Sequence, residues 1–315
     1  MSPCGKLIWI AVCAISLSSN MIAVVRSCDL SPRKVLGENV EIPEMRILEE
    51  PPFEKWLATG RPPLDDIDWR KKFSLGLSHN QMLPSPCGSC WAFGSTGALS
   101  DRIVIRSNGI GFAVSPQGLL DCGREAGSCN GGSHFLAYNF AVKTGLTDET
   151  CLPYRGMDNS NWGETPCGER MCRTCDRFGT CGFANQTLAV RVSEFGSVLG
   201  VDAMKAEILS RGPIACSMYA HSASFENYRG GIIRDDTRYD GTTHVVNVVG
   251  FSNGSDDEND IPHWIVRNSF GTNWGELGYY RVEMGKDIFN MESHNCSWAV
   301  PDPGFISQLK KRWVS

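Results

Sequence analysis

Hydrophobic and polar positions divide this chain into a short apolar run, a polar stretch and a long region of mixed spacing. Residues 7–17 are apolar and uncharged, and the polar residues 18–20 follow them. This layout is typical of a signal peptide, which we expect to cover residues 1–27, with cleavage near Ser18 or just after Ser27. A membrane anchor is the alternative because residues 21–25 are apolar again, but the polar interruption disfavours a span of ~20 apolar residues.

The next part of the chain lacks the spacing of a folded core. Residues 28–62 are rich in proline and acidic residues and show little apolar periodicity. We interpret them as a short prosegment or linker with few contacts to the rest of the chain. Residues 63–315 have the composition of a globular chain and are long enough for one large domain or two packed lobes around a cleft.

Within this region, helical spacing precedes strand-like spacing. A helix is predicted to begin at about Ser89 despite two glycines, and a loop-rich, cysteine-rich stretch covers residues 121–185. The second half predicts a helix over residues 201–211, which ends before Gly212-Pro213. Strands are predicted over residues 187–192, 214–219, 244–251, 264–267 and 278–282. We therefore expect an α-rich first half and a β-rich second half.

Charge and cysteine content narrow the class of protein. The formal net charge is −5, and the basic residues 310–312 resemble a solvated tail, so we expect no nucleic-acid partner. Of the fourteen cysteines, Cys4 and Cys13 would leave with the signal peptide. Export would place the remaining twelve in an oxidising compartment, where disulfides form. Three N-x-[ST] sequons agree with export, at Asn185, Asn253 and Asn295.

The sequence Cys87-Gly88-Ser89-Cys90-Trp91 has the pattern of a cysteine nucleophile at the start of a helix. A thiol attacks a carbonyl only as thiolate, and its usual pKa leaves only a few per cent ionised at neutral pH. The helix dipole and free backbone amides lower the pKa of a sulfur in the first turn, and an imidazolium partner lowers it further. We therefore expect Cys90 to pair with a histidine.

Two other uses of the cysteines are compatible with their spacing. Cys87 and Cys90 have the C-x-x-C spacing of a redox pair. Cys172 and Cys175 have the spacing of zinc ligands. We prefer structural disulfides in a secreted, loop-rich region, and we expect no metal and no organic cofactor.

His244 is the best candidate for the base among six histidines. It begins an apolar strand that would hold its ring at the edge of a core. An imidazole base also needs a group that fixes its second nitrogen. Asn268 follows the next predicted strand and supplies a carbonyl oxygen for that purpose.

With Cys90, His244 and Asn268 in this order, residues 66–300 resemble the papain-like cysteine peptidases. The resemblance implies an α+β fold with two lobes, in which a helical left lobe and a β-barrel-like right lobe enclose the active-site cleft. It also implies that Gln81 binds the oxyanion, that Gly132 binds the substrate backbone and that Trp274 lies near the Asn-His pair. Phe270 departs from the family, which usually has tryptophan at this position.

Within the family, the chain is most similar to the cathepsin X (cathepsin Z) group, through the longer loop after Gln81, the short prosegment and the cysteine cluster at 167–181. The disulfides that this resemblance implies are Cys87–Cys129, Cys122–Cys167, Cys151–Cys172, Cys175–Cys181 and Cys216–Cys296. Cys28 then remains together with Cys90, as expected for a prosegment cysteine that blocks the catalytic sulfur.

The resemblance implies a lysosomal or secreted carboxypeptidase, made as a zymogen and inhibited by its own prosegment. In this group a histidine after the glutamine and a tyrosine before the first cysteine bind the substrate's terminal carboxylate, but this chain has Met82 and Pro86 there. We therefore expect a weakened preference for free C-termini. A papain-type endopeptidase and an inactive binding protein are the alternatives. We expect peptide or protein substrates, a monomer and no stable membrane anchor.

Overall fold

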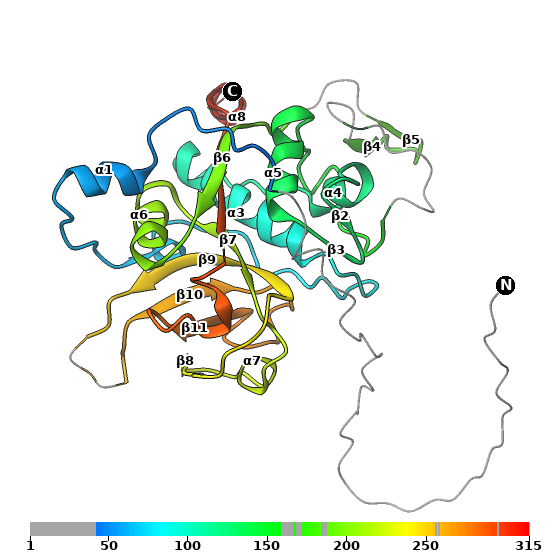
Figure 1. Cartoon of the computed structure of the whole chain (residues 1–315). Helices are drawn as coiled ribbons and strands as arrows, with labels where there is room; N and C mark the ends of the chain where they lie inside the picture. The colour runs from blue at the N-terminus through cyan, green and yellow to red at the C-terminus, as the bar shows by residue number, and fades with distance from the viewer. Residues whose placement is uncertain are drawn as a thin grey trace, which may run out of the picture. The chain divides into compact units, whose positions relative to one another are not determined.

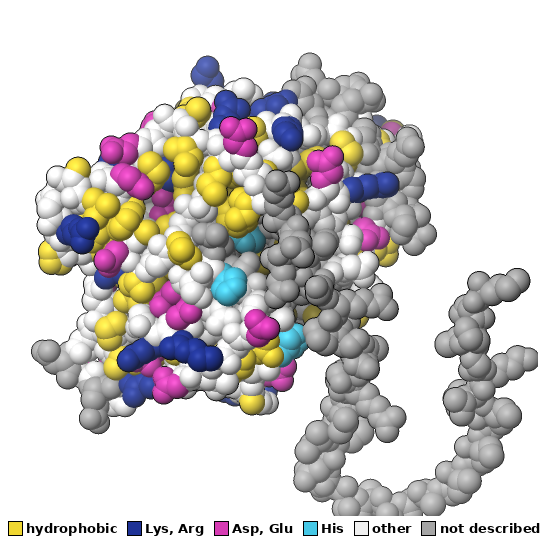
Figure 2. Space-filling view, viewed as in Figure 1, with side chains coloured by type: hydrophobic (Ala, Val, Ile, Leu, Met, Phe, Trp, Pro, Cys, Tyr) yellow, Lys and Arg dark blue, Asp and Glu magenta, His cyan; other side chains and the backbone are white. Residues whose placement is uncertain are grey.

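The computed structural model describes residues 42–314 except for residues 159–166, 168–171, 184–187, 256, 258 and 295. The expected signal peptide, Cys28 and the sequons at Asn185 and Asn295 lie outside the described residues. The described residues belong to one compact unit, residues 34–315. In this part of the chain no helix is long and apolar enough to cross a membrane. Figure 2 shows basic and acidic side chains lying next to one another on one face.

The central element is an eighteen-residue helix, α3 (Cys90–Ser107), which is buried along most of its length. It ends at Asn108, whose left-handed backbone closes the last turn. A Cβ atom at Gly94 would lie 2.5 Å from the Val245 side chain. Glycine inside this helix therefore permits the close approach of a neighbouring strand, which outweighs its low helix propensity.

Three other helices pack with α3 around one hydrophobic core (Figure 1). They are α4 (Pro116–Cys122), α5 (His134–Lys143) and the C-terminal α8 (Pro303–Val314). Two short hairpins accompany this part of the chain: β2 (Gly127–Ser128) with β3 (Gly131–Gly132), and β4 (Arg173–Cys175) with β5 (Cys181–Phe183).

The second core is built on a sheet of eight described strands. Its order is β6 (Val192–Val198), β12 (Cys296–Pro301), β7 (Ile214–Met218), β9 (His244–Ser252), β10 (His263–Arg267), β11 (Tyr279–Glu283) and β8 (Ile232–Ile233), and β1 (Ile67–Asp68) pairs with β9. The order has two different ends, so these strands form an open sheet and no closed barrel. The other described helical elements are α1 (Pro52–Ala58), α2 (Trp69–Lys72), α6 (Val201–Arg211), α7 (Ala223–Glu226) and the 3-10 turn η2 (Ile288–Asn290).

The predicted elements agree with this architecture except at one place. Helix 201–211 is confirmed, and the strands predicted at 214–219, 244–251, 264–267 and 278–282 correspond to β7, β9, β10 and β11. The strand predicted at 187–192 is misplaced: of its described residues, 188–192, only Val192 belongs to a regular strand, β6, which pairs with β12. Val190 instead makes a single bridge to Leu146.

All five disulfides implied by the family resemblance are present in the structure. Cys87 bonds to Cys129, so it does not form the C-x-x-C redox pair with Cys90. Cys172 and Cys175 are both in disulfides, which excludes them as zinc ligands. In the described residues, no group of three or more His, Cys, Asp or Glu residues is placed to hold a metal.

Candidate active site

Cys90 is the first residue of α3 and the one cysteine of the described residues outside a disulfide. Its side chain is buried, with 8% of the residue exposed. The helix start is closed by main-chain bonds, because Ala92 and Phe93 donate their N–H groups to the Ser89 carbonyl oxygen. The sulfur therefore lies where free amides of a helix N-terminus can reach it.

His244, the first residue of β9, lies next to this helix start. The backbone N–H of the following residue, Val245, acts on the Cys90 sulfur and favours its charged form. The Val245 side chain also packs against Gly94, one turn along α3. The close packing of β9 on α3 thus brings the histidine and the cysteine together from positions far apart in the sequence.

Asn268 holds the ring of His244. Its Oδ1 lies 2.8 Å from His244 Nε2 and also accepts the backbone N–H of Ser269 at 2.8 Å. Both the histidine and the asparagine are buried. Asn268 thus binds Nε2, so Nδ1 is the ring nitrogen that remains available as a base. A histidine base requires such an orienting group on its other nitrogen.

Burial affects the protonation of both groups. It raises the pKa of the Cys90 thiol to about 11, although N–H groups of Val245, Trp91 and Cys90 act in the opposite direction. Burial also lowers the pKa of His244 to about 4, against the effect of the hydrogen bond that the ring donates to Asn268 Oδ1. Burial thus favours a neutral thiol and a neutral imidazole. This differs from the expected lowering of the Cys90 pKa, because desolvation outweighs the backbone amides.

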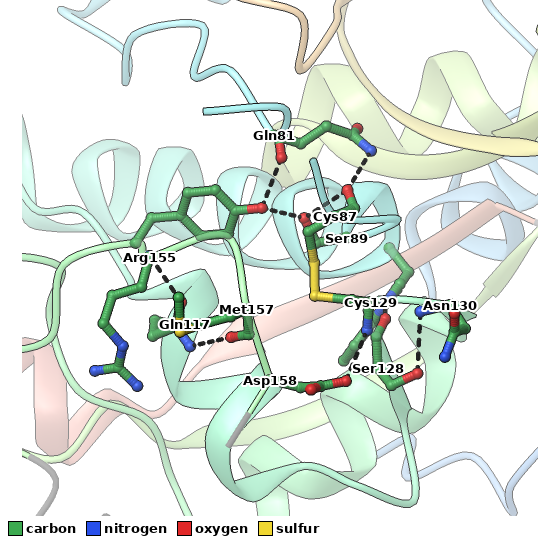
Figure 3. The surroundings of a disulfide bond; sticks show 12 residues. Gln81, Cys87, Ser89, Gln117, Ser128, Cys129, Asn130, Arg155, Met157 and Asp158 are labelled. Carbon is green, nitrogen blue, oxygen red and sulfur yellow. Dashed lines mark hydrogen bonds between the residues drawn. A yellow bond between two sulfur atoms is a disulfide. The ribbon is translucent and has the colours of Figure 1, made fainter. Parts of the chain in front are cut away.

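Gln81 is fixed by both of its side-chain atoms. Its Nε2 donates one hydrogen to the Cys87 carbonyl oxygen at 3.0 Å (Figure 3). Its Oε1 accepts a hydrogen bond from Ser269 Oγ at 2.6 Å. Ser269 was missed in the sequence, where its position directly after Asn268 was the only signal. It connects the glutamine to the His-Asn pair.

A sequence model of the family described as papain family cysteine protease matches residues 64–299. The chain belongs to the papain family of cysteine proteases. It is 38% identical over 245 residues to cathepsin Z of Onchocerca volvulus, which covers 74% of this chain and 76% of that protein.

Solved structures of papain-family proteins share this fold. The digestive procathepsin L2 proteinase of Tenebrio molitor matches with a TM-score of 0.64 and 26% identity, over 83% of this chain and 76% of that one. A cysteine protease of Carica candamarcensis in complex with E-64 matches with a TM-score of 0.59 and 26% identity, over 76% of this chain and 99% of that one. The predicted papain-like α+β fold is therefore confirmed.

Aromatic side chains cover the His-Asn pair of this papain-family chain. The Phe270 ring centroid lies 5.1 Å from that of His244, and Trp274 packs edge-on against Phe270 at 5.8 Å. Phe225, which sequence analysis missed, is fully buried and lies 6.2 Å from His244 and 5.0 Å from Trp274. Phe225 thus adds to the cover that Phe270 provides in place of the usual tryptophan.

Gly132 lies in the β2–β3 hairpin against Trp91, the residue after the cysteine. A Cβ atom at this position would lie 2.6 Å from the Trp91 ring and 2.5 Å from the Ala126 carbonyl oxygen. Trp91 also donates its Nε1–H to the Ser128 carbonyl oxygen at 3.0 Å. Only glycine therefore allows this hairpin to approach the helix start.

Tyr154 is a further site residue that the sequence did not reveal. Its hydroxyl donates to the Gln81 carbonyl oxygen at 2.8 Å and lies 2.7 Å from Ser89 Oγ. It therefore connects the residue before Cys90 with the glutamine that begins the inserted loop. Burial raises the pKa of Tyr154, which keeps the hydroxyl protonated.

The inserted loop at residues 82–86 has exposed apolar side chains at its start. Met82 is 39% exposed and Leu83 is 62% exposed. Asn80 holds the turn, since it accepts the N–H of Met82 at 3.0 Å through its side chain and that of Leu83 at 3.2 Å through its carbonyl. Gly156 approaches Ser85 so closely that a Cβ atom at Gly156 would lie 2.4 Å from the Ser85 carbonyl oxygen.

In place of the histidine that Met82 replaces, His79 and His221 are the sequence candidates for binding a substrate carboxylate, and both lie beside a carboxylate. His79 Nε2 is 3.0 Å from Glu149 Oε2, and His221 Nδ1 is 3.8 Å from Glu226 Oε1. Such a neighbour offsets the positive charge that would attract a substrate carboxylate.

His134 is a buried histidine that serves the fold. At the start of α5, its Nδ1 contacts Ser297 Oγ in β12 and its Nε2 lies 3.1 Å from Ser217 Oγ in β7. Burial lowers its pKa to about 3. Two hydroxyl partners satisfy the neutral ring, so it has no role as a base.

We expect His134 to reduce stability in acid. The unfolded chain binds its proton at a pKa near 6.5, above the folded value, so full stability is present above this pH and is lost as the pH falls. The loss approaches about 1.4 kcal/mol per pH unit below pH 6.5 and amounts to about 2.5 kcal/mol between pH 7 and 4.5. In a Cys90→Ala background, urea unfolding at pH 7 and 4.5 should show a smaller acid loss for His134→Gln. Equal losses in the two proteins would contradict this assignment.

Proposed function

We propose that this papain-family chain is a cysteine-type carboxypeptidase, made as a zymogen with a signal peptide at residues 1–27, a prosegment at 28–62 and a peptidase domain at 63–315. The observation that supports the proposal is the packing of β9 against α3 beside Cys90, together with the His244–Asn268 hydrogen bond and the fixed side chain of Gln81. The similarity to a protein named cathepsin Z supports the choice within the family.

In the proposed reaction, a proton passes from the Cys90 thiol to His244 as the sulfur attacks the substrate carbonyl carbon. Transfer within the pair gives the nucleophilic thiolate and the imidazolium together, so neither buried group carries an uncompensated charge. The second Nε2 hydrogen of Gln81 and the backbone N–H of Cys90 bind the oxyanion. His244 then protonates the leaving amine and activates a water that hydrolyses the thioester, while Asn268 holds its ring.

Gly132 and Trp274 would bind the substrate on either side of this centre. Gly132 presents main-chain groups from the hairpin against Trp91, and Trp274 forms part of the aromatic cover of His244. The loop at 82–86 would close the end of the cleft. The hydrogen bond of Tyr154 to Gln81, directly before the loop, and the close approach of Gly156 to Ser85 support a fixed barrier.

The carboxypeptidase assignment is tested by offering one peptide with a free and with an amidated C-terminus. We expect single residues to be removed, and we expect amidation to lower kcat/KM. Met82→His should raise the free-over-amidated ratio by about ten- to a hundredfold, because a charged hydrogen bond contributes ~1.5 to 3 kcal/mol. Met82→Leu is the matched control and should leave the ratio unchanged.

Two outcomes of this experiment would favour the alternatives. Internal fragments as the main products, with no effect of amidation, would indicate a papain-type endopeptidase. Absence of selective Cys90 labelling by an epoxide thiol trap would indicate an inactive binding protein on the same scaffold.

A covalent lock between Cys28 and Cys90 stays a prediction. Cys90 is a free thiol in the structure, and Cys28 lies outside the described residues. We expect Cys28→Ser to give a zymogen that is active without reductant, because no prosegment cysteine then blocks the sulfur. Non-reducing peptide mapping of the intact zymogen provides the check, and an unmodified Cys90 thiol there would rule out the lock.

We propose that the protein enters the secretory pathway and acts as a monomer in a lysosome-like compartment or outside the cell. Among the proposed glycan acceptors, Asn253 is the one that lies within the described residues. Its Nδ2 donates to the Leu64 carbonyl oxygen at 2.9 Å and to Asp66 Oδ1 at 2.6 Å. A glycan on this nitrogen would displace the start of the peptidase domain.

A further inference from the structure

The end of the proposed prosegment adds to the edge of the sheet. The N–H of Phe195 in β6 donates to the Arg46 carbonyl oxygen at 2.9 Å, which forms an antiparallel bridge. β6 is the terminal strand in the sheet order. Its outer edge therefore offers main-chain groups to which an extended segment can bond.

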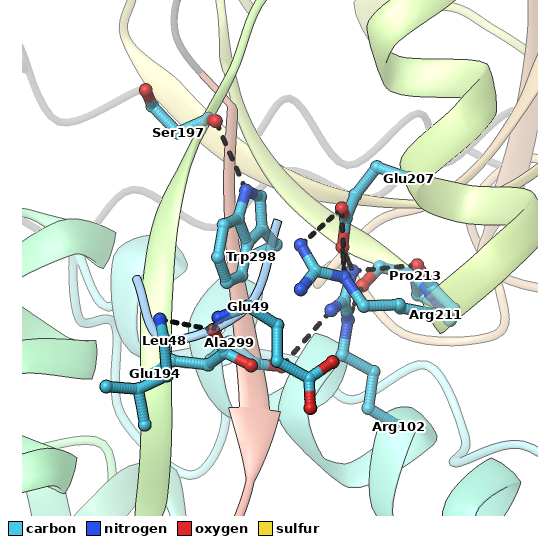
Figure 4. A network of polar contacts seen from close by, with 11 residues as sticks. Leu48, Glu49, Arg102, Glu194, Ser197, Glu207, Arg211, Pro213, Trp298 and Ala299 are labelled. Atoms are coloured by element: carbon cyan, nitrogen blue, oxygen red, sulfur yellow. Dashed lines mark hydrogen bonds and ion pairs between the residues drawn. The ribbon is translucent and has the colours of Figure 1, made fainter. Parts of the chain in front are cut away.

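Glu194, which precedes Phe195 in β6, binds the segment 46–49 through its side chain (Figure 4). Its Oε2 accepts the backbone N–H of Leu48 at 2.9 Å and that of Glu49 at 3.2 Å. Glu194 is only 4% exposed, whereas Leu48 is 63% exposed. The attachment thus depends on the main chain of the segment, with two charge-assisted hydrogen bonds to one buried carboxylate.

A surface cavity of about 410 Å³ lies at this contact. Its walls include Arg46 and Leu48 from the segment and Glu194, Arg211 and Val300 from the peptidase domain. The segment therefore forms one wall of a concave site.

A second anchor follows along the chain. Phe53 in α1 packs against the core of the sheet, and the Trp56 indole donates to the Pro62 carbonyl oxygen at 2.8 Å. Gly60 and Arg61 come after this helix and are exposed. After a cut there, the packing of Phe53 and the hydrogen bond from Trp56 to Pro62 would both be contacts between the two pieces.

This contact is separate from the catalytic centre. Glu194 lies in β6, and His244 lies in β9, with β12 and β7 between them in the sheet. At ~4.8 Å per strand, the two strands are about 14 Å apart.

We propose that Glu194 and the outer edge of β6 form a docking site for the prosegment strand 46–49, which holds the prosegment on the peptidase after the chain is cut. The partner is an extended peptide, recognised by its backbone N–H groups. This inference rests on the proposed function, because it takes residues 28–62 as a prosegment. It adds a contact that is independent of the Cys28 lock.

The test uses the full chain with Cys28→Ser, which removes the covalent link, and with a site-specific protease sequence inserted between Gly60 and Arg61. After cutting, gel filtration with mass spectrometry shows whether the released prosegment peptide, which contains residues 46–49, elutes with the peptidase. We expect retention in this parent protein and at least tenfold weaker retention in Glu194→Ala. Glu125→Gln, which removes an exposed carboxylate, is the control and should behave as the parent.

Hydrogen exchange of the uncut chain gives a second readout. The amides of Leu48 and Glu49 should exchange at least tenfold faster in Glu194→Ala, with unchanged protection in α3, which reports correct folding. Equal peptide retention, or equal exchange at these two amides, in parent and variant would overturn the proposal. Peptide hydrolysis and Cys90 labelling are measured on the same samples, so an inactive protein that still shows the Glu194 effect refutes the proposed function alone.

Discussion

Replacing Gln81 by alanine is expected to lower kcat/KM by about 10²- to 10³-fold. The side chain is buried and fixed by Cys87 and Ser269, so its free Nε2 hydrogen would meet the oxyanion without reorganisation. Loss of one such donor costs about 3 to 4 kcal/mol in the transition state. The effect should appear mainly in kcat, measured with the free-acid peptide substrate.

Ser269→Ala is the matched control for this prediction. It removes the hydroxyl that orients Gln81 and leaves the amide donor in place, so a smaller loss of kcat is expected than for Gln81→Ala. Epoxide labelling of Cys90 should proceed in both variants, which shows that the nucleophile is intact. A Gln81→Ala variant with unchanged kcat would show that the oxyanion is bound elsewhere.

Replacing Glu207 by glutamine is expected to lower the free energy of unfolding by about 3 to 5 kcal/mol, the usual cost of breaking a buried ion pair. Glu207 accepts from Arg102 Nη2 at 2.8 Å and from Arg211 Nη2 at 2.6 Å (Figure 4). Arg102 is 1% exposed, and burial lowers its pKa, which Glu207 opposes. Without the Glu207 carboxylate, the guanidinium groups of Arg102 and Arg211 would both stay charged and would lack a negative partner.

Urea unfolding at pH 7 in a Cys90→Ala background measures this loss. Glu276→Gln is the matched control, since it breaks the ion pair between Glu276 and Arg281. The Arg281 side chain is 35% exposed and the Glu276 side chain is 30% exposed. An exposed pair contributes at most about 1 kcal/mol. Similar losses in the two variants would show that burial of the Glu207 cluster does not decide its contribution.

Local sequence signals predicted the elements whose limits depend on nearby residues. The helix at 201–211 was predicted with the bounds of α6, because its spacing is continuous and glycine and proline follow it. The strand at 187–192 was misplaced, because β6 forms where it can pair with β12, about 100 residues later. The predicted division into an α-rich half and a β-rich half is also incomplete, since α8 packs with the helical core and β1 pairs with β9.

The chemistry of the candidate site could be predicted from residue types and their positions: a cysteine at a helix start, a histidine at the head of an apolar strand and an amide that follows the next strand. The order of these residues was sufficient for the family and the fold, and the family resemblance then implied the disulfide pattern. These signals lie in residue types and short motifs, which need no knowledge of distant contacts.

The environment of those groups could not be predicted, because it depends on how distant segments pack. Ser269 bonds to Gln81, which is 188 residues away in the sequence. The His134 ring contacts two serine hydroxyls, whereas the His244 ring contacts Asn268. Burial also raises the pKa of Cys90, which the helix start alone would lower. The physical reason is that burial and hydrogen-bond geometry result from the packing of distant segments, whereas a local pattern records only the preferences of neighbouring residues.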